Sequence, residues 1–299
     1  MMNSEQRVAT DDVPVIGVAS APALPGALPV RIEAAGLTDI GKRRSANEDH
    51  YIIATFAKSA QLHDTNLDDR SVFDRLQRPP AQLLVVADGV GGKVGGRIAS
   101  SMTVETIAEY LGGIVGCYHR FDVDGEHTFL DHLSTAIQQA HTRLQDEFPG
   151  RRGAATTVTM ATVVWPRMYL VHAGDSRAYY LRRGRLRQIT QDQTMGDVMV
   201  DLGAISEEDA RKRGLYSVLS SAVGSDLSPV VGLIDLEPDD VLLLCTDGLT
   251  THVSDERIAE LLIKSPSADA ACKALADAAL DGGGSDNITV VVAQFPRMT

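Results

Sequence analysis

The feature that most restricts the fold is a series of short β-rich segments between Thr156 and Ile189. The segments read TTVTMATVVW, MYLVHAG, RAYYLRRG and RLRQIT, and only short turns separate them. A parallel crossover needs about a dozen residues or more, so these turns permit only hairpins. We therefore expect a largely antiparallel sheet, with helices outside it.

Segments with a helical spacing of apolar residues accompany this β-rich region. We expect helices in RIASSMTVETIAEYLGGI and over about 129–147, 255–263 and 268–280, because their apolar residues recur on one face. Further strands are expected from Arg31, in HYIIATFA, in SPVVGLIDL and DVLLLCT, and in the final NITVVVAQF. The helices would cover the sheet.

The chain has 299 residues, which fits one large domain with terminal extras. Residues 1–30 contain four prolines and no clear hydrophobic period, so we expect a flexible leader followed by one domain over 31–299. The polar stretch 59–80 is predicted as a loop. Residues 194–225 are polar and punctuated by glycine, and we expect a surface flap built of short helices.

The formal net charge of −12 argues against a protein that binds nucleic acid or an anionic membrane surface. No apolar run approaches the roughly 20 residues that cross a bilayer. The three cysteines, Cys117, Cys245 and Cys272, form no CxxC pair, which favours reduced and mostly buried thiols. These features predict a cytoplasmic protein.

Carboxylates recur where predicted strands begin or end. Glu48 and Asp49 precede one strand, and Asp286 precedes the last. Asp88 and Asp247 each follow an apolar run and are followed by glycine. A single Asp-Gly pair usually marks a turn. Several strand ends can meet in one cleft, however, where crowded carboxylates repel unless cations neutralise them, so the pattern predicts bound metal.

The type of ligand indicates the type of metal. Oxygen donors without cysteine or histidine partners favour Mg²⁺ or Mn²⁺ over Zn²⁺. The glycine after Asp88 would let its own backbone carbonyl approach as a further ligand. Two ions about 3.5–4 Å apart, bridged by a carboxylate, would provide a hydroxide nucleophile at neutral pH.

Such a nucleophile needs an electrophile, and a basic run next to the first carboxylates suggests phosphate. Arg44 lies four residues before Glu48 and could present its planar fork to two phosphate oxygens. Arg43 and Lys42 are alternatives, although a charged run is also what a solvated surface shows.

Seven segments, taken in order, resemble the metal-dependent protein serine/threonine phosphatases of the PPM or type 2C family in its bacterial form. They are GKRRSANED, VADGVGG, GAATTVT, HAGDSRAYYLRRG, LYSVLSSAVG, LLLCTDGLT and GGGSDNITVVV. The resemblance covers about residues 33–294. It implies an α+β fold, a four-layer αββα sandwich of two mainly antiparallel sheets flanked by helices.

The resemblance also implies a two-metal centre for Mn²⁺ or Mg²⁺. Asp88 would bridge both ions, and the Gly89 carbonyl would bind one of them. Asp247 and Asp286 would hold the other ion.

The remaining roles follow from the same resemblance. Glu48 and Asp49 would act mainly through metal-bound waters, and Arg44 would bind the substrate phosphate as a catalytic partner of Asp88. The implied activity is hydrolysis of phosphoserine and phosphothreonine in proteins, opposing a serine/threonine kinase.

Three positions depart from the family pattern. Val90 stands where eukaryotic members often have a histidine, so protonation of the leaving group would fall to a metal-bound water. Arg152 aligns with an acidic ligand of a third metal in bacterial relatives, which puts that ion in doubt. Gln193 replaces a common histidine next to the flap.

Other readings of the motifs are weaker. Lys93 is followed by Val94, where a phosphate-binding P-loop needs serine or threonine. The stretch from Gly174 to Ala178, with His172 nearby, lacks the second glycine of a serine-hydrolase elbow, so we expect His172 to pack in a strand and Asp175-Ser176 to close a turn. A catalytically silent phosphoprotein-binding adaptor of the same fold remains the alternative function.

Overall fold

The computed structural model describes residues 15–17, 30–57, 80–91, 95–114, 123–149 and 154–297. The strands are β1 Val15–Gly17, β2 Glu33–Asp39, β3 His50–Phe56, β4 Ala81–Ala87, β5 Gly89–Val90, β6 Ala155–Thr156, β7 Val158–Val164, β8 Arg167–Ala173, β9 Arg177–Arg182, β10 Arg185–Gln188, β11 Val230–Asp235, β12 Val241–Cys245 and β13 Ile288–Gln294. The helices are α2 Gly95–Ile114, α3 Val123–Glu147, α4 Met195–Asp201, α5 Glu207–Lys212, the 3₁₀ turn η2 Leu215–Ser217, α6 Asp247–Thr250, α7 Asp255–Lys264 and α8 Ala268–Asp281.

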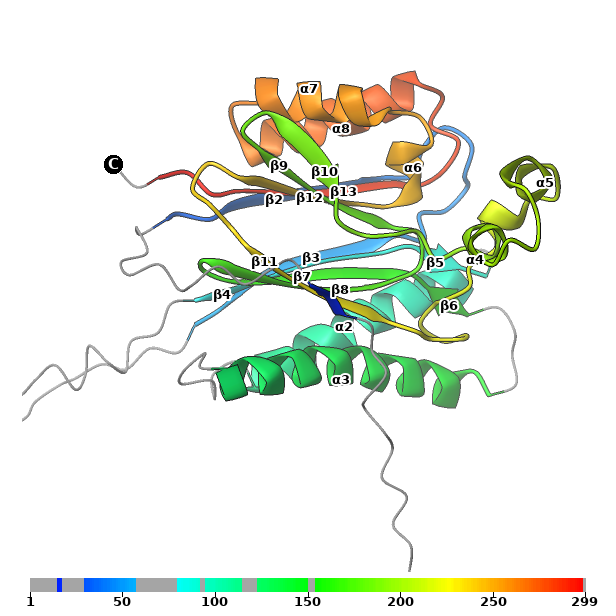
Figure 1. The fold of residues 1–299 in the computed structure, drawn as a ribbon, viewed down its shortest axis with the longest axis horizontal. Helices are drawn as coiled ribbons and strands as arrows, with labels where there is room; N and C mark the ends of the chain where they lie inside the picture. Colours follow the sequence, from blue (N-terminus) through cyan, green and yellow to red (C-terminus); the bar gives the residue numbers. More distant parts are fainter. Residues whose placement is uncertain are drawn as a thin grey trace, which may run out of the picture.

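Two sheets stack face to face, and helices cover both outer faces (Figure 1). One sheet has the strand order β1-β11-β8-β7-β4-β3, and the other has the order β10-β9-β12-β13-β2. In Figure 1, α2 and α3 lie below the first sheet, while α7 and α8 lie above the second. The predicted αββα sandwich is therefore confirmed.

Alternation along β4 shows how one strand serves two layers. Leu83 and Val85 belong to the apolar core shared with α2 and α3, whereas Leu84 and Val86 belong to the core between the sheets. All four side chains are buried. A strand that is buried on both faces has a continuous run of apolar residues. The run LLVVA follows this pattern and ends at Ala87, directly before Asp88.

Pairing within the two sheets is antiparallel, as the short turns predicted, with one exception among the described strands. The strand β1 pairs in parallel with β11 at the edge of the first sheet. It lies inside the stretch that we expected to be a flexible leader, so that expectation does not hold for residues 15–17. The division of the chain into a leader and a domain otherwise stays a prediction.

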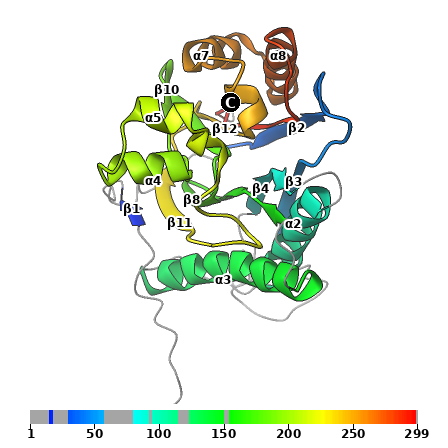
Figure 2. The same cartoon turned by 90° about the vertical axis from the view of Figure 1, so that its right-hand side faces the viewer.

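Other differences from the sequence expectations are small. The helix expected from residue 129 begins six positions earlier, at Val123. The predicted loop 59–80 lies outside the described residues except for its last position. Residues 194–225 do form short helical pieces, α4, α5 and η2, which sit at one end of the sandwich (Figure 2). Among the helices that the structure describes, none is both long enough and apolar enough to span a bilayer.

Candidate metal centre

The predicted carboxylates lie at one end of the sandwich, where strands of both sheets end. Asp88 follows β4 of one sheet, and Asp247 follows β12 of the other as the first residue of α6. The loop between β2 and β3 and the loop that carries Asp286 reach the same end. In Figure 1 this is the right-hand end, where β5, β6 and α6 lie close to α4 and α5.

Asp88 is held in place through its backbone. Its N–H donates to Thr157 Oγ1 at 3.0 Å, and its carbonyl accepts from the Thr157 N–H at 2.9 Å. Thr156 Oγ1 donates to the same carbonyl at 2.8 Å. The two adjacent threonines therefore fix the point at which β4 ends, without using the Asp88 carboxyl group.

Two glycines allow the surrounding segments to approach this point. A Cβ atom on Gly89 would lie 2.3 Å from the Gly96 carbonyl oxygen and 2.6 Å from that of Glu48. Gly41 has φ +76°, and a Cβ there would lie 2.1 Å from the Asp286 carbonyl oxygen. Any side chain at either position would push apart the segments that carry the predicted ligands.

Asp49 is a buried carboxylate, and one of its two oxygens accepts hydrogen bonds from the rest of the fold. Its Oδ2 accepts from Thr246 Oγ1 at 2.9 Å and from Thr289 Oγ1 at 2.8 Å, while Oδ1 has no partner. Burial, together with the charges of Asp247 and Asp286, raises the pKa of Asp49 to about 7 against the opposing effect of the two hydroxyl hydrogen bonds. The site therefore disfavours a bare negative charge here.

Asp88 and Asp247 show the same crowding more strongly. Burial raises the pKa of Asp88 well above its usual range, and the charges of Asp49 and Asp247 add to the effect. Burial also raises the pKa of Asp247, followed by the charge of Asp286, while a hydrogen bond with the Asp88 carboxyl group opposes the shift. The carboxyl groups are thus close enough to share a proton when no cation is present.

Arg44 joins the centre by pairing with one of its carboxylates. Arg44 Nη2 donates to Asp286 Oδ2 at 2.6 Å, and this hydrogen bond is the main reason that the pKa of Arg44 is raised. The arginine side chain is 53% exposed, so one face of the guanidinium is open to solvent. Asn287 holds the loop around Arg44 by donating to the Ile40 and Ala46 carbonyls at 2.9 and 3.0 Å.

The donor set fits divalent cations that prefer oxygen. The buried carboxylate oxygens without a hydrogen-bond partner in the described part of the chain are Glu48 Oε1, Asp49 Oδ1 and Asp247 Oδ1. An unpaired buried carboxylate is costly, and a hard cation is the group that would satisfy several at once. No three His, Cys, Asp or Glu side chains within the described ranges are already gathered as a finished metal-binding group. The ligands would therefore have to close around the ions.

Sequence reasoning missed Asp175, which we expected only to close a turn between β8 and β9. Burial raises the pKa of Asp175 to about 7, and the charge of Asp247 is the next largest cause. Asp175 and Asp247 line one cavity of about 480 Å³. Gly174 separates Asp175 from the apolar strand MYLVHA and serine follows it, so the sequence shows only part of the pattern that marks Asp88.

The other residues that the sequence analysis considered lie outside the centre or outside the described residues. His172 is 2% exposed in β8, and burial lowers its pKa to about 4, so it is a neutral, packed strand residue as expected. Arg43 and Lys42 are exposed, and no described hydrogen bond or ion pair joins their side chains to the centre. Arg152 lies outside the described residues.

A comparison with protein families matches the description Protein phosphatase 2C over residues 58–281. The chain belongs to the protein phosphatase 2C family. The match spans Asp88 and Asp247, whereas Arg44 and Asp286 lie just beyond its ends.

Two relatives of this chain are named as bacterial phosphatases. The serine/threonine protein phosphatase PstP of Mycobacterium tuberculosis is 36% identical over 217 residues, which are 71% of this chain and 40% of that protein. The chain thus matches less than half the length of PstP. The protein phosphatase PhpP of Streptococcus pneumoniae is 28% identical over 87% of this chain and 96% of its own.

Solved structures agree with the fold. A serine/threonine phosphatase of S. agalactiae superposes with a TM-score of 0.72 at 27% identity, over 88% of this chain and 99% of that one. The catalytic domain of PstP, solved in complex with two manganese ions, gives a TM-score of 0.66 at 31% identity, over 90% and 100%.

Proposed function

We propose that this chain is a metal-dependent protein phosphatase that hydrolyses phosphoserine and phosphothreonine in proteins. The observation that carries the proposal is that Asp49, Asp88 and Asp247 lie at the same end of the sandwich, where burial raises the pKa of each, and that Asp49 and Asp247 each keep a buried carboxylate oxygen without a hydrogen-bond partner. Membership of the protein phosphatase 2C family supports it, as do the relatives named as serine/threonine phosphatases.

We infer that two Mn²⁺ or Mg²⁺ ions occupy the centre. Asp88 would bridge them with the Gly89 carbonyl beside it, and Asp247 and Asp286 would complete the protein ligands. Glu48 and Asp49 would orient waters around the ions. When bound, the ions supply Lewis acidity to the phosphate oxygens and to the attacking water. The two ions of the PstP catalytic domain support this number.

The residues of the chain supply position and charge. Arg44 would turn its open guanidinium edge to the phosphate, because bidentate pairing fits two phosphate oxygens and orients the ester for in-line attack. Its contact with Asp286 keeps it beside the centre before substrate arrives.

Thr156 and Thr157 hold the Asp88 backbone, so the carboxyl group stays directed at the site. The proposed ligand set contains no serine or cysteine, so the proposal involves no covalent phosphoenzyme.

The proposed substrates are phosphorylated proteins, including those of an opposing serine/threonine kinase. We also propose a cytoplasmic location, supported by Cys245 and Cys272, which are buried and not in disulfides.

The test is turnover of p-nitrophenyl phosphate and of a phosphothreonine peptide, with Mn²⁺ and with EDTA. The proposal predicts hydrolysis of both substrates only with the metal. A folded chain that hydrolyses neither would favour the silent adaptor.

A further inference from the structure

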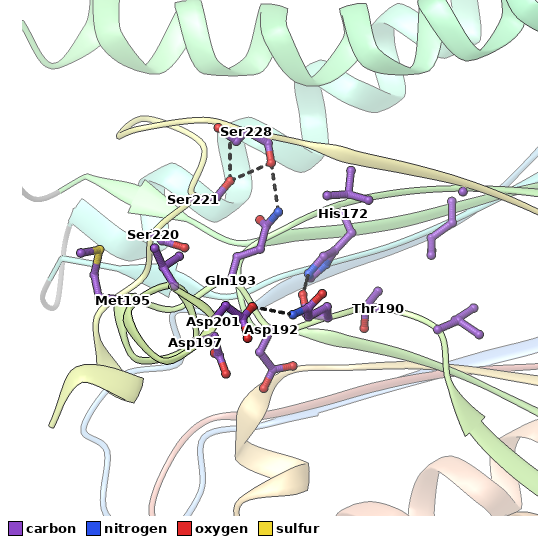
Figure 3. A pocket seen from close by; sticks show the side chains of 16 residues that line it. His172, Thr190, Asp192, Gln193, Met195, Asp197, Asp201, Ser220, Ser221 and Ser228 are labelled. Carbon is purple, nitrogen blue, oxygen red and sulfur yellow. Dashed lines mark hydrogen bonds between the residues drawn. The ribbon is translucent and has the colours of Figure 1, made fainter. Parts of the chain in front are cut away.

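A second cavity, of about 580 Å³, lies beneath the flap and beside the metal centre. Its floor is formed by β8 and β11, its wall by residues 189–193 and its roof by α4 (Figure 3). The apolar part of the lining comes from Leu170, Ile189, Met195, Val198 and Val230, next to the bare backbone of Gly232. An aliphatic side chain would be removed from water here.

The polar part of the lining is acidic. Asp192, Asp197 and Asp201 lie together on one side of the cavity in Figure 3, and the described lining residues include no lysine or arginine. Asp192 is paired with Arg177 at 2.7 Å. Within the described part of the chain, the hydrogen bond recorded for the Asp201 carboxylate is a long one, 3.4 Å from Gln191 Nε2, which leaves the carboxylate available to a cation.

The cavity adjoins the cavity of the metal centre and shares lining residues with it. Asp192 and Asp197 also line the 480 Å³ cavity that reaches Asp175 and Asp247. An extended peptide whose phosphorylated residue lies at Asp247 could therefore pass these two aspartates and enter the space under α4.

Gln193 braces one side of the cavity, and apolar side chains are exposed on the flap above it. The Gln193 side chain accepts from the Gly174 N–H at 2.9 Å and donates to the Ser228 carbonyl at 3.0 Å. On the flap above it, Val198 is 39% and Leu202 is 77% exposed. A preformed pocket below exposed apolar side chains is typical of a surface that binds another chain.

We propose that this cavity is a docking pocket for the phosphoprotein substrate, which inserts an aliphatic side chain beside Gly232 and sets an adjacent lysine or arginine against Asp201. The inference rests on the proposed phosphatase function and adds a sequence preference to it. The occupant follows from the apolar floor, the acidic rim and the two aspartates that this cavity shares with the cavity of the metal centre.

The experiment uses phosphothreonine peptides in which a Leu-Lys pair moves one position at a time through a Gly-Ser background. At one spacing the pair should raise kcat/KM about tenfold over the peptide without it, the discrimination an apolar pocket commonly gives. Hydrolysis of p-nitrophenyl phosphate, which carries no such side chain, reports the chemistry alone.

Gly232→Val tests the pocket directly. A Cβ at this position would find Leu170 Cβ at 3.7 Å, an ordinary contact, so the larger side chain can be built while filling the cavity. The variant should lose the tenfold gain and keep p-nitrophenyl phosphate turnover. Gly113→Val, whose Cβ would meet no atom within 4 Å, is the matched control.

Asp201→Asn tests the charged rim and should reduce the preference for Leu-Lys over Leu-Gln by a few fold. Glu208→Gln, a flap carboxylate outside the cavity lining, should leave the preference unchanged. The proposal is overturned if no spacing gives a gain, or if Gly232→Val lowers both kinds of turnover equally.

Binding of a fluorescent Leu-Lys peptide with a non-hydrolysable phosphonate separates docking from catalysis. Weaker binding of the peptide to Gly232→Val than to the wild-type chain supports the pocket. If the wild-type chain hydrolyses no substrate, that result counts against the proposed function and not against the pocket. Equal binding to both chains would overturn the pocket.

Discussion

The metal centre buries side chains that are usually exposed, whereas the flap exposes an apolar side chain that is usually buried. At the centre, Asp49 is 4% exposed although it carries an ionisable group, whereas on the flap Leu202 is 77% exposed although it is apolar. A buried carboxylate is costly unless it is neutralised, whereas a single exposed leucine is tolerated. The difference fits the two proposals, in which a cation completes the centre and a substrate side chain occupies the pocket beneath the flap.

The two regions also differ in how they are held. Asp49 accepts hydrogen bonds from Thr246 and Thr289, which belong to distant parts of the chain. The flap helices are held mainly by local caps, such as Thr194 on α4 and Ser206 on α5. We therefore expect substitutions at the centre to act on chemistry and ion binding, and substitutions on the flap to act on substrate choice.

The largest expected effect is that of Asp88→Asn, which removes the proposed bridging carboxylate. Activity with Mn²⁺ should fall roughly 1000-fold or more, because the ions would lose their shared ligand. The backbone contacts to Thr156 and Thr157 are unchanged, so the circular dichroism spectrum and Tm should not fall. Substantial residual turnover of p-nitrophenyl phosphate would remove the bridging role.

Arg44→Ala should have the next largest effect. Loss of the guanidinium should reduce kcat/KM by about 100-fold, in the range expected when a charged contact to the phosphate is removed. Arg44→Lys should recover only part of this loss, because an ammonium group cannot pair in a bidentate way. Arg43→Ala is the matched control, and an equal loss there would contradict the choice of Arg44.

Stability without divalent ions should depend on pH through the buried carboxyl groups. The pKa of Asp49 is raised to about 7 in the folded chain, so the folded state keeps a proton that the unfolded state releases. Stability is then present at low pH and is lost as pH rises through 7. Between pH 6 and 8 one such group lowers the free energy of unfolding by about 1.4 kcal/mol.

Thermal melts in EDTA at the two pH values measure this change. Asp49→Asn should reduce the pH dependence, and saturating Mn²⁺ should remove it because the ion replaces the proton. A wild-type Tm that rises from pH 6 to pH 8 in EDTA would contradict the sign of the shift.

The smallest effect is expected on the flap. Leu202→Ser replaces an exposed side chain that is outside the core, so the free energy of unfolding should change by less than about 0.5 kcal/mol. Turnover of p-nitrophenyl phosphate should be unchanged as well. A large loss of stability, measured by urea unfolding, would show that Leu202 is part of the fold and would weaken the contrast between the two regions.

Local signals in the sequence allowed a largely antiparallel sheet with outer helices to be predicted, and the resemblance to the family added the two-sheet sandwich. Turns of two or three residues enforce hairpins, and the apolar run that ends at Asp88 marks a buried strand. The parallel strand β1 could not be predicted, since three residues in a proline-rich stretch gain their partner only from the edge of β11.

The same distinction applies to the site. Asp88 and Asp247 were recognisable because glycine follows each after an apolar strand. Asp175 was missed because Gly-Asp-Ser between two strands is typical of an ordinary turn. Only the packing of the sheets brings Asp175 near Asp247. The pairing of Arg44 with Asp286, 242 positions apart in the chain, likewise depends on the fold.

The most direct test is anomalous scattering from crystals grown with Mn²⁺. The account predicts two manganese peaks at the end of the sandwich, with Asp88 touching both and with Asp247 and Asp286 at one of them. A well-ordered structure at saturating Mn²⁺ with no manganese peak beside Asp88 would contradict it.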